Sequence, residues 1–230
     1  MEPMYRVEDK YSCDEQAITL IQTRLKAVLS PDKNQFSDDG YKITSVYFDD
    51  YFDTNLQETI DGYHLRKKYR IRIYNDSFQT IKLEIKYKKN NRVYKKMQHI
   101  TQEQMKTLLA GECLPDDHPS SDSTITLFNL AIANHRLQPK VIVEYDRAAY
   151  IFDAGNVRIT LDRNLRFSTD FDGFINQNQA HYFPVHDFDR VVEVKYDEFF
   201  PSFIAGLLET GNMNQTSYSK YRICREAANK

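Results

Sequence analysis

The stretch that decides the fold is residues 69–97, "YRIRIYNDSFQTIKLEIKYKKNNRVYKKM". Apolar and polar side chains alternate along it: Ile71 and Ile73 fall on one side, and Arg70 and Arg72 fall on the other. A period of two is typical of strands with one apolar and one polar face. Asn-Asp-Ser and Asn-Asn segments separate the runs and favour tight turns. The stretch therefore predicts three antiparallel strands whose polar face is rich in cations.

Composition places the chain among ordinary globular proteins. Its 230 residues are 41% hydrophobic and include only 7 Gly and 7 Pro, which argues against disorder and predicts a single domain spanning residues 1–230. The formal net charge of -2 argues against a bulk-basic nucleic-acid binder. The aromatic residues are spread over apolar faces rather than grouped among basic residues, as single-strand binders require. We expect no nucleic-acid partner.

The cysteines and the hydropathy of the sequence indicate in which compartment of the cell the protein is expected. Three cysteines lie far apart without Cys-x-x-Cys spacing, which argues against a zinc site or a disulfide framework. No stretch approaches the ~20 apolar residues of a membrane span, and no apolar signal run stands at the start. We expect a cytoplasmic protein without a membrane span of its own, so any membrane partner would be a separate chain. The six histidines lack ligand spacing, and none is assigned a role.

Alternation recurs in at least seven runs along the chain, and on five of them the polar side carries Arg or Lys at successive positions. One interpretation is a sheet packed on one face with a solvated polar face. The other is a closed antiparallel β-barrel with helices on its outside and its charged faces turned inward. Arg and Lys outnumber Ser, Thr and Gln on these faces, and the amphipathic helices need the apolar strand faces for docking. We therefore expect an α+β fold with a basic tunnel.

Helices are predicted from caps and apolar spacing. Ser12, with Glu15 three residues later, predicts a capping box for the first helix. Thr101, Gln104 and Gly111 predict the start and the stop of a short second helix. Further helices are expected at about residues 124–137, 202–209 and 217–228.

A basic tunnel has consequences for ligands. Roughly eight cations would lie close together in it, and like charges in a partly desolvated cavity repel strongly. The interleaved Glu8, Glu84 and Glu193 neutralise only a few of them. The remaining charge favours a polyanion, and phosphate groups accept paired donors from Arg and a point charge from Lys. Carboxylates among cations also indicate a divalent metal, Mn²⁺ or Mg²⁺, that bridges carboxylate and phosphate.

Seven short motifs then occur in an order that resembles a known family. They are Arg6-x-Glu8-x-Lys10, Arg70-x-Arg72-x-Tyr74, Glu84-x-Lys86, "EYDRAAY" (144–150), "VRITLD" (157–162), "VEVKY" (192–196) and "SKY" (219–221). Together they resemble the VTC (vacuolar transporter chaperone) domain, the polyphosphate polymerase branch of the triphosphate tunnel metalloenzymes. The resemblance implies an antiparallel tunnel barrel that binds the triphosphate of a nucleotide and a growing polyphosphate and requires Mn²⁺ or Mg²⁺.

Site residues follow from the resemblance, motif by motif. The residues expected to act on the transferred phosphate are Lys10, Arg70, Arg72, Lys86, Arg147 and Arg158. Further phosphate contacts are expected at Arg6, Lys95 or its neighbour Lys96, Tyr145, Lys195, Ser219 and Lys220. Glu193 is expected to bind the metal, with Glu8 beside it. Tyr145 shares a predicted face with Val141 and Val143, so either a bulge re-aims its side chain or the phase predicted for that strand is wrong.

Three functions remain open from the sequence. The first is transfer of the terminal phosphate of ATP to a polyphosphate chain, with no covalent nucleophile. The second is a triphosphatase on the same tunnel, in which Glu8 or Glu84 orients a water molecule. The third is a non-catalytic polyphosphate-binding module that serves a separately encoded membrane partner.

Overall fold

A computed structural model describes residues 5–33, 35, 37, 40–115, 122–185 and 190–229. Two of the six histidines, His118 and His186, lie outside these residues, as does most of the loop before residue 122. In the described part of the chain, no helix is both long enough and apolar enough to cross a membrane.

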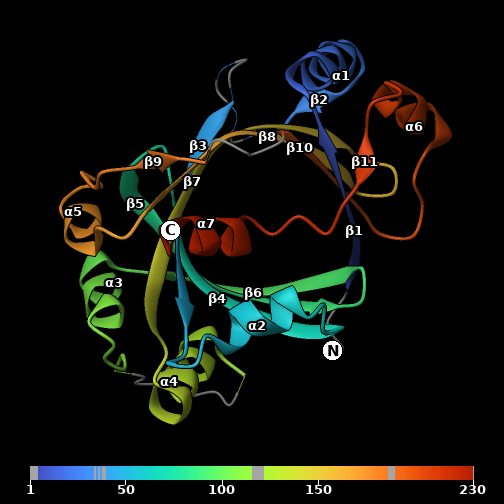
Figure 1. Ribbon diagram of the computed structural model, residues 1–230. Helices are drawn as coiled ribbons and strands as arrows, with labels where there is room; N and C mark the ends of the chain where they lie inside the picture. The colour runs from blue at the N-terminus through green and yellow to red at the C-terminus, as the bar shows by residue number, and fades with distance from the viewer. Residues whose placement is uncertain are drawn as a thin grey trace.

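Eight long strands pair in a ring, and all of their pairings are antiparallel (Figure 1). The order around the ring is β7-β3-β4-β5-β6-β1-β10-β8, and β8 pairs back to β7. The predicted antiparallel sheet is therefore confirmed. The eight strands are β1 (Arg6–Cys13), β3 (Tyr41–Asp49), β4 (Leu65–Tyr74), β5 (Ser77–Lys89), β6 (Arg92–Ile100), β7 (Gln138–Phe152), β8 (Val157–Ser168) and β10 (Arg190–Tyr196).

Tight turns produce the predicted meander β4–β5–β6. Asn75 and Asp76 both take positive φ angles, 50° and 55°, between the paired residues Tyr74 and Ser77. Two successive positive φ angles match the twist of the flanking strands, and Asn and Asp tolerate them better than most residues. Three two-residue strands extend the sheet: β2 (Ser30–Pro31) on β7, β9 (Phe183–Pro184) on β8 and β11 (Asn214–Gln215) on β1.

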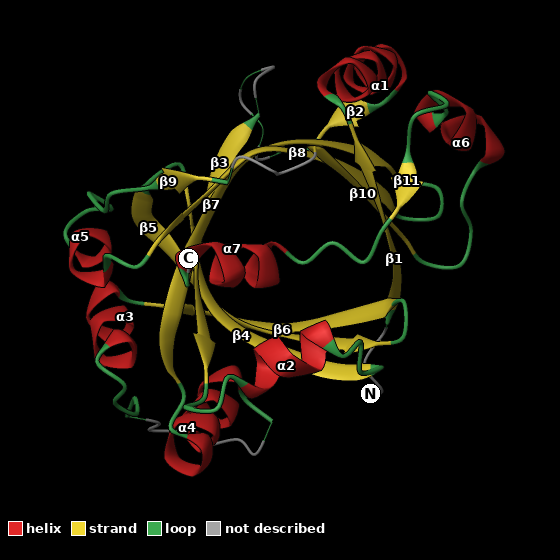
Figure 2. Cartoon of the chain, in the orientation of Figure 1, coloured by secondary structure: helices red, strands yellow, loops and turns green. Residues whose placement is uncertain are grey.

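Two apolar layers cover the outside of the ring (Figure 2). In one layer, α1 (Glu15–Val28) and α6 (Ser202–Leu208) pack on the outward apolar residues of β8 and β10. In the other, α3 (Gln102–Leu109), α4 (Thr124–His135) and α5 (Phe171–Ile175) pack on β4 and β5. The apolar strand faces therefore point outward under helices, as the alternation predicted. A short helix, α2 (Thr54–Ile60), follows β3.

The last helix, α7 (Lys220–Ala228), departs from the expectation that every helix packs outside. It lies across the ring, as Figure 1 shows, and its Tyr221 and Cys224 pack against inward-facing residues of β3 and β7. The physical reason is that part of the inward face of β7 is apolar, at Val141 and Val143. This part of the interior needs an apolar partner, and α7 supplies it.

Of the two capping boxes predicted at helix starts, one is confirmed and the other is wrong. The capping box of α3 is confirmed: the Thr101 side chain accepts from the Gln104 backbone N–H, and the Gln104 side chain accepts from the Thr101 N–H. The predicted Ser12 cap is wrong, because β1 continues to Cys13. Asp14 caps α1 instead, and its carboxylate accepts from Ala17 N–H at 2.7 Å.

Candidate functional site

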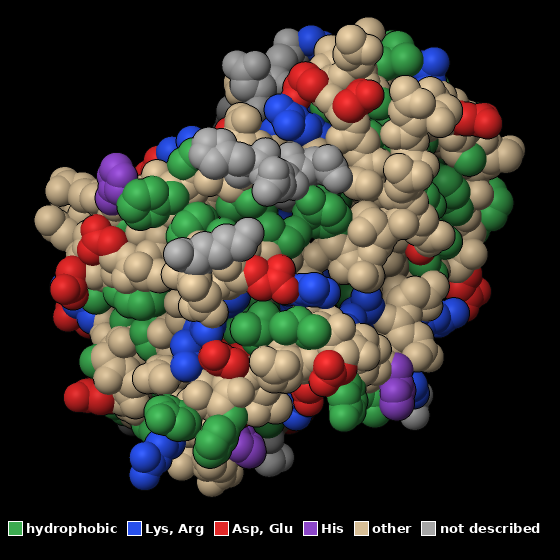
Figure 3. Space-filling model, in the orientation of Figure 1, with side chains coloured by type: hydrophobic (Ala, Val, Ile, Leu, Met, Phe, Trp, Pro, Cys, Tyr) green, Lys and Arg blue, Asp and Glu red, His purple; other side chains and the backbone are tan. Residues whose placement is uncertain are grey.

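Three adjoining chambers follow the interior of the ring. A wide chamber of about 510 Å³ lies at one end and shares the two β4 arginines, Arg70 and Arg72, with a middle chamber of about 80 Å³. A narrow chamber of about 40 Å³ lies at the other end and shares Lys68 with the middle one. Figure 3 shows Lys and Arg side chains near the middle of the face that looks along the ring. The lysines and arginines thus converge on a passage rather than fan over an open surface.

The middle chamber is strongly basic. Eight of its lining residues are Lys or Arg, and among them stands one carboxylate, that of Glu193. The basic residues come from β1, β4, β5, β7, β10 and the start of α7: Lys10, Lys68, Arg70, Arg72, Lys86, Arg147, Lys195 and Lys220. Such a set attracts polyanions and requires that the cations find partners when no ligand is bound.

Arg70 has a carboxylate partner inside the ring. Its Nε and Nη2 lie 2.7 and 2.6 Å from Oε2 of the fully buried Glu84, whose other oxygen accepts from Lys95 Nζ at 2.7 Å. Burial opposes the charge on Glu84, but Arg70, Arg72 and Lys95 outweigh it and hold the pKa of this carboxyl well below its usual range. Arg70 also donates to the Tyr47 hydroxyl at 3.0 Å. Its guanidinium is therefore fixed before any ligand arrives.

Arg72 is held by neutral groups only, within the described residues. Its Nε donates to Ser45 Oγ at 3.0 Å, and its Nη2 lies 3.4 Å from the Tyr145 hydroxyl. The side chain is buried and lines both the middle and the wide chamber. Its positive charge is therefore the one most available to an anion between the two chambers.

Asp162 joins two of the predicted residues. Arg147 forms a two-point pair with its carboxylate, at 2.6 and 2.7 Å, and Lys220 Nζ reaches the same group at 2.6 Å. Asp162 is fully buried; burial would raise its pKa, but the two cations hold that pKa below its usual value. This network links β7, β8 and the first residue of α7, and so it positions Lys220 in the chamber.

The two predicted metal ligands share lysine partners. Lys195 Nζ lies 2.5 Å from Glu193 and 3.2 Å from Glu8, and Lys10 Nζ lies 3.5 and 3.6 Å from the same two groups. Lys86 Nζ contacts both oxygens of Glu8, at 2.8 and 2.7 Å. Burial and the neighbouring lysines lower the pKa of Lys86 to about 7, in spite of Glu8.

The donor set fits a divalent metal only with help from a ligand. Within the described ranges there is no group of three or more His, Cys, Asp or Glu side chains that could hold a metal ion. Mg²⁺-type sites often use one or two carboxylates and complete the shell with water and substrate phosphate oxygens. Glu8 and Glu193 supply two carboxylates, so these residues fit Mn²⁺ or Mg²⁺ that enters with a phosphate ligand.

The other predicted residues divide between the chambers and the outside. Arg6, Lys95 and Arg158 line the wide chamber, and Ser219 lines both of the others. Arg158 Nε pairs with Asp32 at 2.9 Å, and its Nη2 donates to the Tyr41 hydroxyl. Of the two alternatives, Lys95 and Lys96, only Lys95 lines one of the three chambers. Lys96 bonds Asp122 on the outside, and the structure does not bring it to the chambers.

Tyr145 faces the interior together with Val141 and Val143, so the phase predicted for this strand was wrong. The pairing of β7 with β8 is irregular between Glu144 and Asp146, but Tyr145 stays on the face of the two valines. That face is the inner one. This inner face is apolar where Tyr221 and Cys224 of α7 pack on it. It is polar beside the first residue of α7, where the Lys220 Nζ lies 4.7 Å from the centre of the Tyr145 ring.

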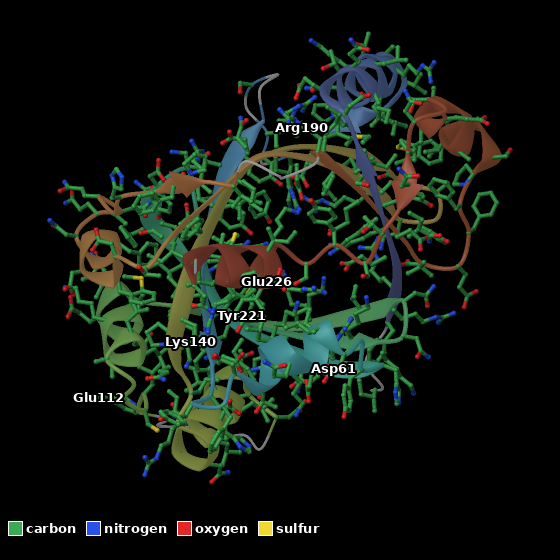
Figure 4. All side chains as sticks on the ribbon, in the orientation of Figure 1. Asp61, Glu112, Lys140, Arg190, Tyr221 and Glu226 are labelled. Atoms are coloured by element: carbon green, nitrogen blue, oxygen red, sulfur yellow. The ribbon has the colours of Figure 1, made fainter. Side chains whose placement is uncertain are left out.

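Sequence reasoning missed several residues of the site. Lys68 and Asp162 were available from the same alternation, because they fall on the faces of Arg70 and Arg158. Tyr221 lies on α7, which crosses the ring (Figure 4). Its ring stacks on that of Tyr47 with centres 5.1 Å apart, and both residues line the middle chamber. The Tyr221 hydroxyl donates to Asp49 at 2.6 Å. No local pattern predicts this contact, because α7 comes more than 170 residues later.

Comparison with known proteins places the chain in a family. The VTC domain profile matches residues 5–229, and the chain therefore belongs to the VTC domain family. The recognition from the seven motifs is thus confirmed. No protein with a curated description matches the sequence.

Solved structures resemble this one at low identity. A candidate adenylate cyclase from Bacillus halodurans is 12% identical with a TM-score of 0.52, over 85% of this chain and 82% of that one. A Pyrococcus horikoshii OT3 protein is 14% identical with a TM-score of 0.49, over 97% and 99%. The Pct1 RNA triphosphatase of S. pombe is 11% identical with a TM-score of 0.32, over 84% and 71%. The first supports the fold alone, and the scores of the other two are too low to support a conclusion.

Proposed function

We propose that the protein is a polyphosphate polymerase, which transfers the terminal phosphate of ATP to a growing polyphosphate chain inside the ring of strands. Membership of the VTC domain family supports this proposal. The observation that carries it is the middle chamber, where eight basic side chains stand with one carboxylate. The ring would then act as a closed tunnel barrel in which phosphate groups are held in line.

The triphosphate of ATP would lie across the wide and the middle chamber, which share Arg70, Arg72 and Arg147. The wide chamber has room for the nucleoside, and the middle one admits only a narrow anionic chain. Arg70 and Arg147 are already fixed by Glu84 and Asp162. Donors that are fixed in advance stabilise developing charge on the transferred phosphate without reorganising, which accounts for large rate effects in phosphoryl transfer.

Glu193 and Glu8 would hold Mn²⁺ or Mg²⁺ together with phosphate oxygens, and the metal would supply neutralising charge when bound. Lys10 and Lys195 contact both carboxylates without a ligand. These lysines would turn to the phosphates when the metal binds. No covalent nucleophile is required, because the acceptor is the terminal phosphate of the chain.

The test is to incubate the purified protein with ATP and Mn²⁺ or Mg²⁺ and to measure ADP and polymer together. Equal amounts of ADP and chain-bound phosphate are expected. Release of orthophosphate from ATP or tripolyphosphate without polymer would favour a triphosphatase instead. Tight binding of polyphosphate with no turnover in either metal would favour a binding module and would contradict the proposal.

A further inference from the structure

A pocket of about 400 Å³ lies on the outer side of the ring of strands, and we call it the outer pocket. Helices α2 and α4 flank it beside the outer faces of β4 and β5 (Figure 1). Its volume falls in the ~300–1,000 Å³ range that is usual for small-molecule sites. It shares Arg66 and Lys88, near the ends of β4 and β5, with the narrow chamber. Because its floor lies on the opposite face of these strands, the outer pocket is a different site from the passage, and the proposed function does not use it.

The floor of the outer pocket is apolar and aromatic. Tyr69 of β4 and Tyr87 of β5 line it together with Ala131 of α4 and Leu137, and all four belong to the outer apolar layer on β4 and β5. An edge contact with Phe128, at 5.4 Å between ring centres, fixes the Tyr69 ring. Aromatic side chains stack on the faces of nucleobases without regard to their sequence. The floor is therefore suited to a flat ring system.

The α2 side of the pocket carries a carboxylate that is free to bind a ligand. Asp50, which precedes the helix, accepts from the Thr54 backbone N–H at 2.9 Å and so serves the start of α2. The Glu58 side chain, in contrast, makes no hydrogen bond or ion pair with the residues that the structure describes. Burial and the neighbouring Asp49 and Asp50 raise the pKa of its carboxyl. Glu58 can accept from hydroxyl groups, as an acidic residue does from ribose in dinucleotide-binding folds.

Cations without a carboxylate partner, in the part of the chain that the structure describes, line the strand side. Lys67 is exposed on the outer face of β4, and its Nζ lies 5.7 Å from the centre of the Tyr87 ring. Lys88 forms no ion pair there, and Arg66 donates to backbone carbonyls at 3.4 Å. Arg66 and Lys67 attract Glu58 without pairing with it. Ammonium and guanidinium groups of this kind bind phosphate.

We propose that the outer pocket binds a nucleoside monophosphate. The base lies on the floor formed by Tyr69 and Tyr87, the ribose hydroxyls donate to Glu58, and the phosphate lies between Lys67 and Lys88. A phosphate monoester carries roughly -1.5 to -2 charges at neutral pH, which balances these two lysines. A triphosphate would need the larger set of cations that the passage provides.

The first experiment measures binding by calorimetry on the full chain, with AMP, adenosine and ribose 5-phosphate as probes. AMP can reach the floor, the carboxylate and the cations at once, whereas adenosine lacks the phosphate and ribose 5-phosphate lacks the base. We expect AMP to bind with one equivalent per chain, and each fragment to bind at least about tenfold more weakly. No binding of AMP, or a fragment that binds as tightly as AMP, would overturn the proposal.

Lys67→Met tests the position of the phosphate. We expect AMP to bind this variant about tenfold more weakly, the effect of one charge-assisted hydrogen bond, and adenosine to change by less than about twofold. Lys89→Met is the matched control, because Lys89 is exposed on β5 and does not line the outer pocket, and it should bind AMP like wild type. Equal losses for AMP and adenosine, or no loss for AMP, would contradict the proposal.

Glu58→Ala tests the position of the ribose. In wild type, dideoxy-AMP, which lacks both ribose hydroxyls, should bind about tenfold more weakly than AMP. In Glu58→Ala the two ligands should bind alike, because the acceptor is gone. The control is Glu103→Ala, exposed on α3 and outside the pocket lining, which should keep the wild-type difference. A difference that persists in Glu58→Ala would show that another group holds the ribose and would overturn the assignment.

Arg72→Met separates the outer pocket from the passage. Arg72 lines the middle and the wide chamber but not the outer pocket, so this variant should bind AMP like wild type even where polymer formation is lost. Loss of AMP binding in Arg72→Met would place the nucleotide in the passage and overturn the outer site. If wild type binds AMP but forms no polymer from ATP, the polymerase proposal fails and the outer site stands.

Discussion

Two strands of the same ring, β4 and β7, turn very different faces inward. The inward face of β4 carries Lys68, Arg70 and Arg72, and open chambers lie against it. The inward face of β7 begins with Val141 and Val143, and α7 packs against it. The interior is thus divided into a charged part that stays open and an apolar part that is filled. The apolar part has a functional consequence, because it fixes the helix whose first residue, Lys220, returns to the charged part.

The largest effect on stability is expected from Tyr221→Ala. Tyr221 is 2% exposed, packs on the apolar side and stacks on Tyr47. Removing a buried aromatic side chain typically costs about 3–5 kcal/mol, and the loss would also free the start of α7. Urea unfolding measures it, with the exposed Tyr63→Ala as the control, which should stay within ~0.5 kcal/mol. Similar losses in the two variants would show that α7 does not stabilise the fold.

Glu84→Gln tests the buried ion pairs in the charged part of the interior. It removes the counter-charge of Arg70 and Lys95, and breaking such a buried pair costs roughly 3 kcal/mol at neutral pH. The pKa of Glu84 is lowered in the folded state, so its stabilisation is present above the ordinary value of ~4.3 and is lost as the pH falls below it.

Two results therefore check the Glu84 prediction. The difference in unfolding free energy between wild type and Glu84→Gln should shrink as the pH falls below the ordinary value, and tripolyphosphate should restore stability to the variant at neutral pH. A difference that grows at acid pH would contradict the ion-pair account.

Arg72→Met is expected to impair function more than folding. Arg72 has neutral partners among the described residues, so its loss leaves no buried carboxylate unpaired. Removing one fixed donor to a developing charge typically lowers the rate ~100-fold or more. Polymer formation from ATP measures it, with the exposed Arg92→Met on β6 as the matched control. A decrease below tenfold, with folding intact, would place the transferred phosphate elsewhere.

The smallest effect on stability and activity is expected from a substitution at Tyr145, which lies between the charged and the apolar part of the interior. Tyr145→Phe keeps the ring that packs against the apolar side and removes only the hydroxyl, which lies at a long 3.4 Å from Arg72. We expect less than ~1 kcal/mol of lost stability and a modest decrease in polymer formation. Thermal unfolding and the polymer assay together check this. A loss as large as that of Arg72→Met would mean that Tyr145 contacts the phosphate directly.

The contrast between β4 and β7 also explains what the sequence could predict. On β4, one face is charged and the other is apolar, so the alternation indicated which side chains share a face, and the amphipathic helices indicated that the charged face points inward. On β7, Ile142 points outward while Val141 and Val143 point inward, and all three are apolar. No period distinguishes the two faces there, and the inner one is recognised only from the position of α7. Contacts such as Tyr221 with Asp49 join segments that are 172 residues apart in the sequence and leave no local signal.

The proposed function requires that the inward arginines and lysines hold a triphosphate within the ring of strands. A crystal structure with a non-hydrolysable ATP analogue and Mn²⁺ tests it most directly. We expect phosphate groups between Arg70, Arg72 and Arg147 in the middle chamber, with the nucleoside in the wide one. Phosphates bound on the outer surface, with the middle chamber holding only water, would contradict it.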